Sequence, residues 1–187
     1  MPPPALLPLP GEDHVCSACG VAYAALGAAD AIAAVATVPG RSRDAALAVP
    51  EPARRRRPDP DTWSVVEYVC HLRDVYANFT IRLHRIRTEN GPVLEPMLND
   101  LRARRFRYNE RDLRAVLDEL AATAAGFLDE TRRLTGADWE RTATRLPGER
   151  RTARWLVRHA AHEGVHHLRD IATVAAAVMG VAAAAPD

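Results

Sequence analysis

The sequence predicts an all-α protein, built as a four-helix bundle with a long connection between its second and third helices. Apolar residues recur at helical spacing in four stretches, and no stretch shows the strict alternation of a half-buried strand. Prolines and glycines separate these stretches. With 187 residues, 48% of them hydrophobic, the chain can bury one substantial core. We therefore expect an irregular segment over residues 1–20, followed by one bundle domain over residues 21–187.

The first helical stretch, residues 23–49, is rich in alanine and is interrupted by Pro39 and Gly40. Because proline lacks a backbone donor and clashes with the preceding turn, we expect the first helix to break or bend there. Residues 50–61 then carry four arginines between prolines. No aromatic side chains interleave these arginines, so they favour a solvated connector over a nucleic-acid contact.

The second helix is expected to begin at Asp61 or Thr62 and to reach Arg87. Its apolar residues lie three and four positions apart, as on one face of a helix. They are Val65, Val69, Leu72, Tyr76, Phe79 and Leu83. The following residues, 89–100, contain one glycine and two prolines, so they predict a long connection across one end of the bundle.

Two more helices complete the expected bundle. The third is expected to begin near Asp112 and to end at the sequence TGAD, residues 135–138. The last is expected to run from about Thr152 to Val178. Each helix carries one apolar stripe, and four such stripes are buried together in a bundle.

The composition argues against several classes of partner. Twenty-five basic and 24 acidic side chains give a formal net charge of +1, which provides no global field for nucleic acid or an anionic membrane. No apolar run reaches the roughly 20 residues of a membrane span, and the N-terminus lacks the pattern of a signal peptide. Three cysteines form no disulfide framework and fit a reducing compartment. We expect a cytoplasmic protein that binds neither nucleic acid nor membranes.

The last helix contains the densest group of metal-binding residue types, HAAHEGVHHLRDI at residues 159–171. Its apolar side chains define the inward direction at about 100° per residue. Glu163 and His167 lie at the edge of that apolar arc, where a side chain enters a crevice between helices. His162 and His166 share the same four-residue spacing but point towards solvent.

His71 lies at the edge of the apolar stripe of the second helix, so it can face Glu163 and His167 across the bundle. Two histidines and a carboxylate give three ligands and leave positions open, as a catalytic divalent metal requires. Zinc suits this set best, and nickel or iron are alternatives. The competing interpretation is two hydrogen-bonded core histidines and a carboxylate paired with arginine. Asp74 and Asp170 follow the histidines and either orient their rings or form surface ion pairs.

Two stretches resemble the DinB-like superfamily of four-helix-bundle metalloproteins: DTWSVVEYVCHLRD on the second helix and HEGVHHLRDI on the last. The spacing of Glu163, His167 and Asp170 is similar to that of the mycothiol-dependent maleylpyruvate isomerase branch. That resemblance implies that the glutamate and histidine bind metal together with His71. Other branches use a His-x-x-x-His pattern, which His162 and His166 would supply. RYNERD, in the connection before the third helix, is similar to actinobacterial members.

The N-terminal segment contains Cys16 and Cys19, which have the spacing of half a zinc site or of a redox pair. Two ordinary thiols are the third interpretation. A complete zinc site needs two more ligands, for which His14 and Cys70 are the candidates. Cys70 adjoins His71 along the helix and should point away from it, which favours a packing role.

The leading functional hypothesis is a metal-dependent enzyme of thiol chemistry. The resemblance implies an S-transferase or isomerase that uses mycothiol, or another low-molecular-weight thiol, as co-substrate with a small electrophile. The second hypothesis uses the metal to activate water for hydrolysis. The third is a non-catalytic bundle in which the metal or the helix packing serves stability or homodimer formation.

Overall fold

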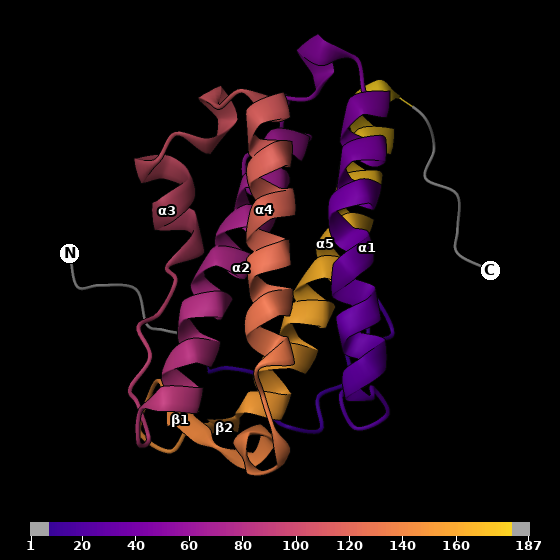
Figure 1. Cartoon of the computed structure of the whole chain (residues 1–187). Coiled ribbons are helices and arrows are strands. Elements are labelled where there is room, and N and C mark those ends of the chain that lie inside the picture. The colour runs from indigo at the N-terminus through magenta and orange to yellow at the C-terminus, as the bar shows by residue number, and fades with distance from the viewer. Residues whose placement is uncertain (1–7, 181–187) are drawn as a thin grey trace.

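The computed structural model describes residues 8–180, which form a four-helix bundle (Figure 1). Within that range the long helices are α1 (Ala28–Ala48), α2 (Val65–Thr88), α4 (Leu113–Arg132) and α5 (Ala153–Met179). α1 packs on α5 and α4, and α2 packs on α4 and α5. The four apolar stripes meet in one core, which confirms the predicted fold class.

The helices begin where side chains can satisfy the free backbone donors of a first turn. Ser64 and Glu67 form a capping box at the start of α2, two residues beyond the predicted boundary. The side chain of Asp112 accepts a hydrogen bond from a backbone amide of α4, and that of Thr152 does the same for α5. Both positions match the predicted starts.

The long connection follows from the direction of the helices. In Figure 1 the N-terminal ends of α2 and α4 lie at the same end of the bundle, so these neighbours run parallel. The chain must therefore return along the whole bundle between them. It does so through α3 (Asn99–Arg105) and a 3-10 turn, η2 (Tyr108–Glu110).

The predicted break in the first helix is wrong, because α1 continues through Pro39. α1 also begins at Ala28, later than the start of the predicted stretch. Its buried face runs on either side of the proline without a change of register. The buried residues are Ala31, Val35, Val38, Ser42 and Ala46. Burial of this face against α4 and α5 outweighs the cost of about 3 kcal/mol that proline imposes on a helix interior.

The absence of strands was also predicted wrongly. β1 (Thr142–Thr144) and β2 (Arg150–Thr152) pair antiparallel and lead directly into α5. The backbone of Leu94 donates to the carbonyl of Thr144 at 2.7 Å, so this hairpin also holds the start of the long connection. Strands of three residues are too short to show an alternating pattern.

The N-terminal segment, residues 8–27, lies against α5. The indole of Trp155 donates to the carbonyl of Gly11 at 3.1 Å, and Arg158 donates to that of Leu26 at 2.9 Å. Arg169 donates to the carbonyl of Ala18 further along α5. This segment therefore covers a face of α5 that a bundle of four helices alone would leave exposed. Of the helices within residues 8–180, none is long and apolar enough to cross a membrane.

Candidate metal centre

The structure brings together His71 on α2 with Glu163 and His167 on α5. Glu163 Oε2 lies 3.3 Å from His71 Nε2 and 3.4 Å from His167 Nε2. The three donor atoms lie within 4.8 Å of one another. They occupy the crevice between α2 and α5, which is where the edges of the two apolar stripes were expected to meet.

Charge and burial in this group match a cation-binding site. Burial lowers the pKa of His71, against the opposing effect of Glu163. Burial alone would raise the pKa of Glu163, but hydrogen bonds with His167 and His71 hold it well below its usual value. Burial also opposes the charge on His167, yet hydrogen bonds with Asp170 and Glu163 raise its pKa to about 9. The carboxylates thus favour positive charge at this point, and a divalent metal ion would satisfy the same requirement.

The neighbouring side chains fix the two imidazoles. Asp170 Oδ2 lies 2.7 Å from His167 Nδ1, so the other ring nitrogen faces Glu163. A carboxylate on the far nitrogen is a common way to orient a metal-binding histidine. The Trp63 ring packs beside His71 with a centroid separation of 5.1 Å.

Asp74, the other predicted orienting carboxylate, lies elsewhere. It accepts hydrogen bonds from Tyr108 and from Arg102, the latter at 2.6 Å, and pairs with Arg73 at 2.8 Å. Within the described residues no hydrogen bond joins it to His71. Asp74 therefore does not orient His71. It forms ion pairs, as in the alternative prediction, but these are buried rather than at the surface, since Asp74 is 7% exposed. The reason is that Asp74 lies one turn on and faces the returning connection rather than α5.

A cavity of about 130 Å³ adjoins the group and is lined by both His71 and Glu163. Residues 96–99 of the long connection form part of its wall. Arg82 also lines it, is 6% exposed, and has an Nε atom without a hydrogen-bond partner within the described residues. Arg145, which pairs with Glu149, contributes a second guanidinium. The lining of the cavity therefore contains two candidate ligands and two guanidinium groups, one of which pairs with Glu149.

His159 is a residue of this site that the sequence analysis did not select. Its Nε2 atom lies 3.7 Å from Glu163 Oε1, and its ring stacks on Trp155 with a centroid separation of 4.5 Å. Burial lowers its pKa to about 4, so the ring is neutral near pH 7. The spacing His159-x-x-x-Glu163-x-x-x-His167 was readable in the sequence and places all three on one side of the helix.

The predicted exposure of His162 and His166 is wrong. His162 is only 7% exposed and its Nδ1 atom lies 2.9 Å from the hydroxyl of Tyr23, while His166 is half-buried. The N-terminal segment causes this burial, because it covers the face of α5 opposite the bundle core. A helical wheel assigns such a face to solvent since it contains no information about an irregular segment.

Cys16 and Cys19 lie beside these two histidines, and the four donor atoms fall within 4.8 Å of one another. The expected partners, His14 and Cys70, are not in this group. His14 packs its ring against Tyr23, and the Cys70 thiol points to the carbonyl of Tyr108 at 3.7 Å. Cys70 is buried among core residues, in agreement with its predicted packing role.

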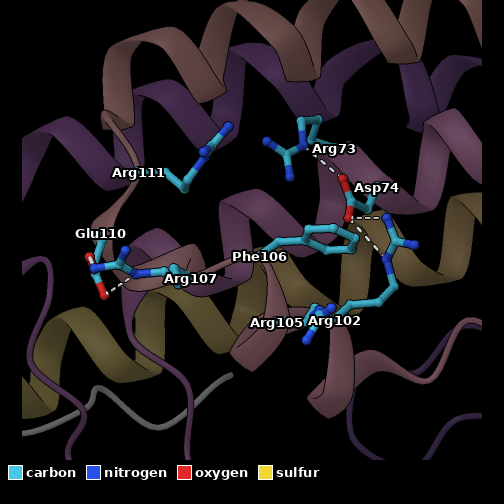
Figure 2. A pocket seen from close by; sticks show the side chains of 8 residues that line it. All are labelled: Arg73, Asp74, Arg102, Arg105, Phe106, Arg107, Glu110 and Arg111. Atoms are coloured by element: carbon cyan, nitrogen blue, oxygen red, sulfur yellow. Dashed lines mark hydrogen bonds and ion pairs between the residues drawn. The ribbon is translucent and has the colours of Figure 1, made fainter.

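A wider cavity of about 640 Å³ opens between α2 and the segment that joins α3 to α4 (Figure 2). Asp74 is neutralised there by Arg73 and Arg102, and Glu110 pairs with Arg107. Arg105 and Arg111 also line this cavity, which leaves it positively charged. It contains none of the candidate metal ligands, so it is not the cavity of the metal centre.

Comparison with known proteins places this geometry in a family. The model of the DinB superfamily matches residues 34–171. Among solved structures, YfiT from Bacillus subtilis is similar, with a TM-score of 0.75 and 19% sequence identity over 83% of this chain and 89% of that one. YfiT is described as a probable metal-dependent hydrolase with an unusual four-helix bundle topology. No curated protein matches the chain. Because the family model spans well over half of the sequence, the chain belongs to the DinB superfamily.

Proposed function

We propose that the protein is a divalent-metal-dependent enzyme whose metal is held by His71, Glu163 and His167. One observation carries this proposal: three donor atoms converge at the edge of a cavity that is lined by two of the same residues. Two histidines and one glutamate are a donor set of catalytic zinc sites, which keep a position open for water or substrate. Zinc suits the set best, with nickel and iron as alternatives.

The walls of the cavity point to a small anionic substrate. Arg82 is buried, and its Nε donor has no partner within residues 8–180. A buried unpaired donor is costly, so a carboxylate or similar anion in the cavity would stabilise it. Burial lowers the pKa of Arg82 to about 10, which still leaves the guanidinium charged near pH 7.

Hydrolysis is the reaction that the dimensions favour. A volume of about 130 Å³ is below the roughly 300–1,000 Å³ of pockets for drug-sized ligands, so a water molecule and a small acidic substrate fit better than a whole thiol co-substrate does. When bound, a divalent metal would polarise the substrate and lower the pKa of water. Arg82 would bind the substrate anion, and His159, which also lines the cavity, would contact the substrate. The description of YfiT as a probable hydrolase supports the same reaction class.

Thiol-dependent transfer or isomerisation is the second candidate. It is favoured by the spacing of Glu163, His167 and Asp170, which resembles the mycothiol-dependent branch. Residues 96–99 belong to a connection rather than to a helix of the core, so displacement of this wall would enlarge the cavity for a thiol. A metal ion held by His71, Glu163 and His167 would lower the pKa of a thiol in this cavity and so favour the nucleophilic thiolate.

The test combines metal content with turnover. Protein purified without a metal-affinity tag is loaded with Zn²⁺, Ni²⁺ or Fe²⁺ and assayed on small esters and amides of carboxylic acids, with and without added thiols. His71→Ala should lose one equivalent of metal and its turnover. His84→Ala is the matched control, because His84 lies on the same helix, exposed and away from the group.

The outcomes separate the candidates. Turnover without a thiol supports hydrolysis, and turnover that requires a thiol supports the second candidate. Full metal content in His71→Ala, or equal loss in His84→Ala, would contradict the proposed ligands. A metal-loaded protein that turns over no substrate of either class would favour a non-catalytic bundle.

A further inference from the structure

We propose that Cys16, Cys19, His162 and His166 form a second metal site, a closed structural zinc site that fastens the N-terminal segment to α5. The four residues each offer one donor atom, and these atoms lie within 4.8 Å of one another. Cys16 Sγ is 3.5 Å from His166 Nδ1. Two thiolates and two imidazoles are a tetrahedral donor set of structural zinc, with no position left open for a substrate. The site is therefore different in kind from the one proposed at His71.

The backbone directs both thiols towards α5. The amide of Cys16 donates to the carbonyl of Val21 at 2.9 Å, and the amide of Gly20 donates back to the carbonyl of Cys16 at 2.8 Å. Gly20 has φ of 77°, in the left-handed region that favours glycine, so the chain turns sharply directly after Cys19. The two histidines lie one turn apart on α5, which is the spacing at which helical side chains meet one ligand.

An unsatisfied nitrogen points to a missing ligand. His162 is only 7% exposed, and its Nε2 atom has no hydrogen-bond partner within residues 8–180. Such a buried polar atom costs about 1–3 kcal/mol unless something occupies its lone pair or its proton. A metal ion at the centre of the group would bind this nitrogen directly.

The hydrogen bonds around Tyr23 make that nitrogen a lone-pair donor. The Tyr23 hydroxyl contacts His159 Nδ1 at 2.7 Å and His162 Nδ1 at 2.9 Å, so it can donate to one ring and accept from the other. His159 Nε2 faces the carboxylate of Glu163, which favours a proton on that nitrogen. Tyr23 then donates to His159 and accepts from His162 Nδ1. This leaves Nε2 of His162 unprotonated, the form that binds a metal.

His166 has a matching arrangement. Its Nε2 atom lies 3.6 Å from Asp170 Oδ2, while Nδ1 faces the Cys16 thiol. The nitrogen that faces Cys16 is the one that a metal ion in this group would bind. His162 and His166 thus each offer one ring nitrogen to the group that contains the two cysteines.

The effect of such a site would be to hold residues 8–27 in place. This segment supplies Tyr23, which contacts His159 beside the first metal centre. Because an unfolded chain presents no preformed site, the free energy of zinc binding adds to the stability of the folded segment. Zinc at this position would therefore maintain one wall of the proposed active site without taking part in the reaction.

The experiment uses the full chain, purified without a metal-affinity tag and reconstituted with Zn²⁺ or with Co²⁺ as a spectroscopic probe. We expect two metal equivalents per chain and, with Co²⁺, a thiolate-to-cobalt charge-transfer band together with the strong visible bands of a tetrahedral site. Cys16→Ser with Cys19→Ser should remove one equivalent and the charge-transfer band. Cys70→Ser is the matched control, since its buried thiol lies outside the group, and it should retain both.

His71→Ala distinguishes the two metal sites. This variant should lose the metal equivalent of the proposed catalytic site and keep the charge-transfer band of the cysteine site. That result distinguishes failure of the zinc site from failure of the proposed enzyme.

If the cysteine variant does not fold, the wild-type chain still gives an answer: Zn²⁺ should slow modification of two thiols by a thiol reagent, and a chelator should restore the rate. Three results would overturn the proposal. They are two metal equivalents in a folded cysteine variant, thiols that Zn²⁺ does not protect in the wild-type chain, and a Cys16–Cys19 disulfide in protein expressed in a reducing compartment.

Discussion

Gly164 shows how one residue sets the distance between helices next to the candidate metal centre. A Cβ atom at this position would lie 2.5 Å from the Tyr76 hydroxyl and 2.5 Å from Val38 Cγ2. Both are closer than real contacts allow, and Tyr76 and Val38 are fully buried. α5 can therefore approach α1 and α2 at this point only because residue 164 has no side chain.

We expect Gly164→Ala to destabilise the protein by up to about 2 kcal/mol. Overpacking of a core costs about 1–3 kcal/mol, and replacing a helical glycine by alanine returns up to about 1 kcal/mol. Gly126→Ala is the matched control, because Gly126 lies inside α4 and its added Cβ meets no atom within 4 Å. The control should gain stability. Urea unfolding of both variants checks the difference, and equal effects at the two glycines would contradict the steric argument.

The sequence predicted which side chains come together at the candidate metal centre more fully than it predicted their neighbours. Helical spacing placed Glu163 and His167 on the side that faces α2, because both lie on the same regular helix as the apolar residues that define its inward side. His159 was not predicted, although it precedes Glu163 by the same four residues by which His167 follows it. The burial of His162 was not predictable, as it depends on an irregular segment whose path no periodicity records.

At the scale of elements, a cluster around Asp74 attaches the long connection to α2. Arg102 of α3 and Tyr108 of η2 both donate to this carboxylate, and Arg73 pairs with it from α2 itself. Burial would raise the pKa of Asp74, but the hydrogen bonds from Tyr108 and Arg102 and the charge of Arg73 outweigh it, and the pKa is lowered. The carboxylate form is thus the form that holds the connection.

The lowered pKa gives a pH dependence with a definite sign. The stabilisation is fully present above the unfolded pKa of about 3.9 and is lost as the pH falls through the lower pKa of the folded state. We expect Asp74→Asn to lose about 2–3 kcal/mol at neutral pH, because charged hydrogen bonds are removed. Its stability should also fall less steeply in acid than that of the wild type. Urea unfolding as a function of pH measures both effects.

Asp100→Asn serves as the comparison for this substitution, since Asp100 is exposed on α3. It should leave the stability at neutral pH near that of the wild type. An Asp74→Asn variant with an unchanged acid slope would show that this carboxylate does not hold the connection.

Elements with strong signals were predictable, and those that depend on tertiary packing were not. Caps at Asp112 and Thr152 gave two helix starts because they are local. Pro39 was misleading, since a locally unfavourable residue is tolerated where the buried face of α1 continues on both sides. The hairpin before α5 was missed because its strands have three residues each.

At the scale of the whole molecule, metal should contribute to global stability. An ion that binds only the folded chain adds about 2.7 kcal/mol when its concentration is 100 times its dissociation constant. We expect a chelator to lower the free energy of unfolding of the metal-loaded wild type, measured by urea unfolding. A variant combining His71→Ala, Cys16→Ser and Cys19→Ser should show no response to the chelator. A persistent response would locate a metal outside both proposed centres.

The parallel arrangement of α2 and α4 also belongs to this scale. The sequence predicted a long connection at residues 89–100 but placed it across one end of the bundle, which is wrong, because the chain runs along the bundle through α3. A connection that long is needed because the chain has to return to the end from which α2 started (Figure 1). Periodicity determines which side of a helix is buried and contains nothing about which way its neighbour runs.

Neighbouring residues of α5 face different proposed metal centres. His162 and Glu163 are adjacent, as are His166 and His167, and within each pair one side chain turns towards the N-terminal segment and the other towards α2. Two anchors about 100° apart around one axis would fix the rotation of the helix as well as its position. Metal binding at either proposed centre would then fix the rotation of α5 that the other centre requires. The factor by which each centre raises the metal affinity of the other must be the same. An insertion or deletion of a single residue within this part of α5 would misalign both centres at once.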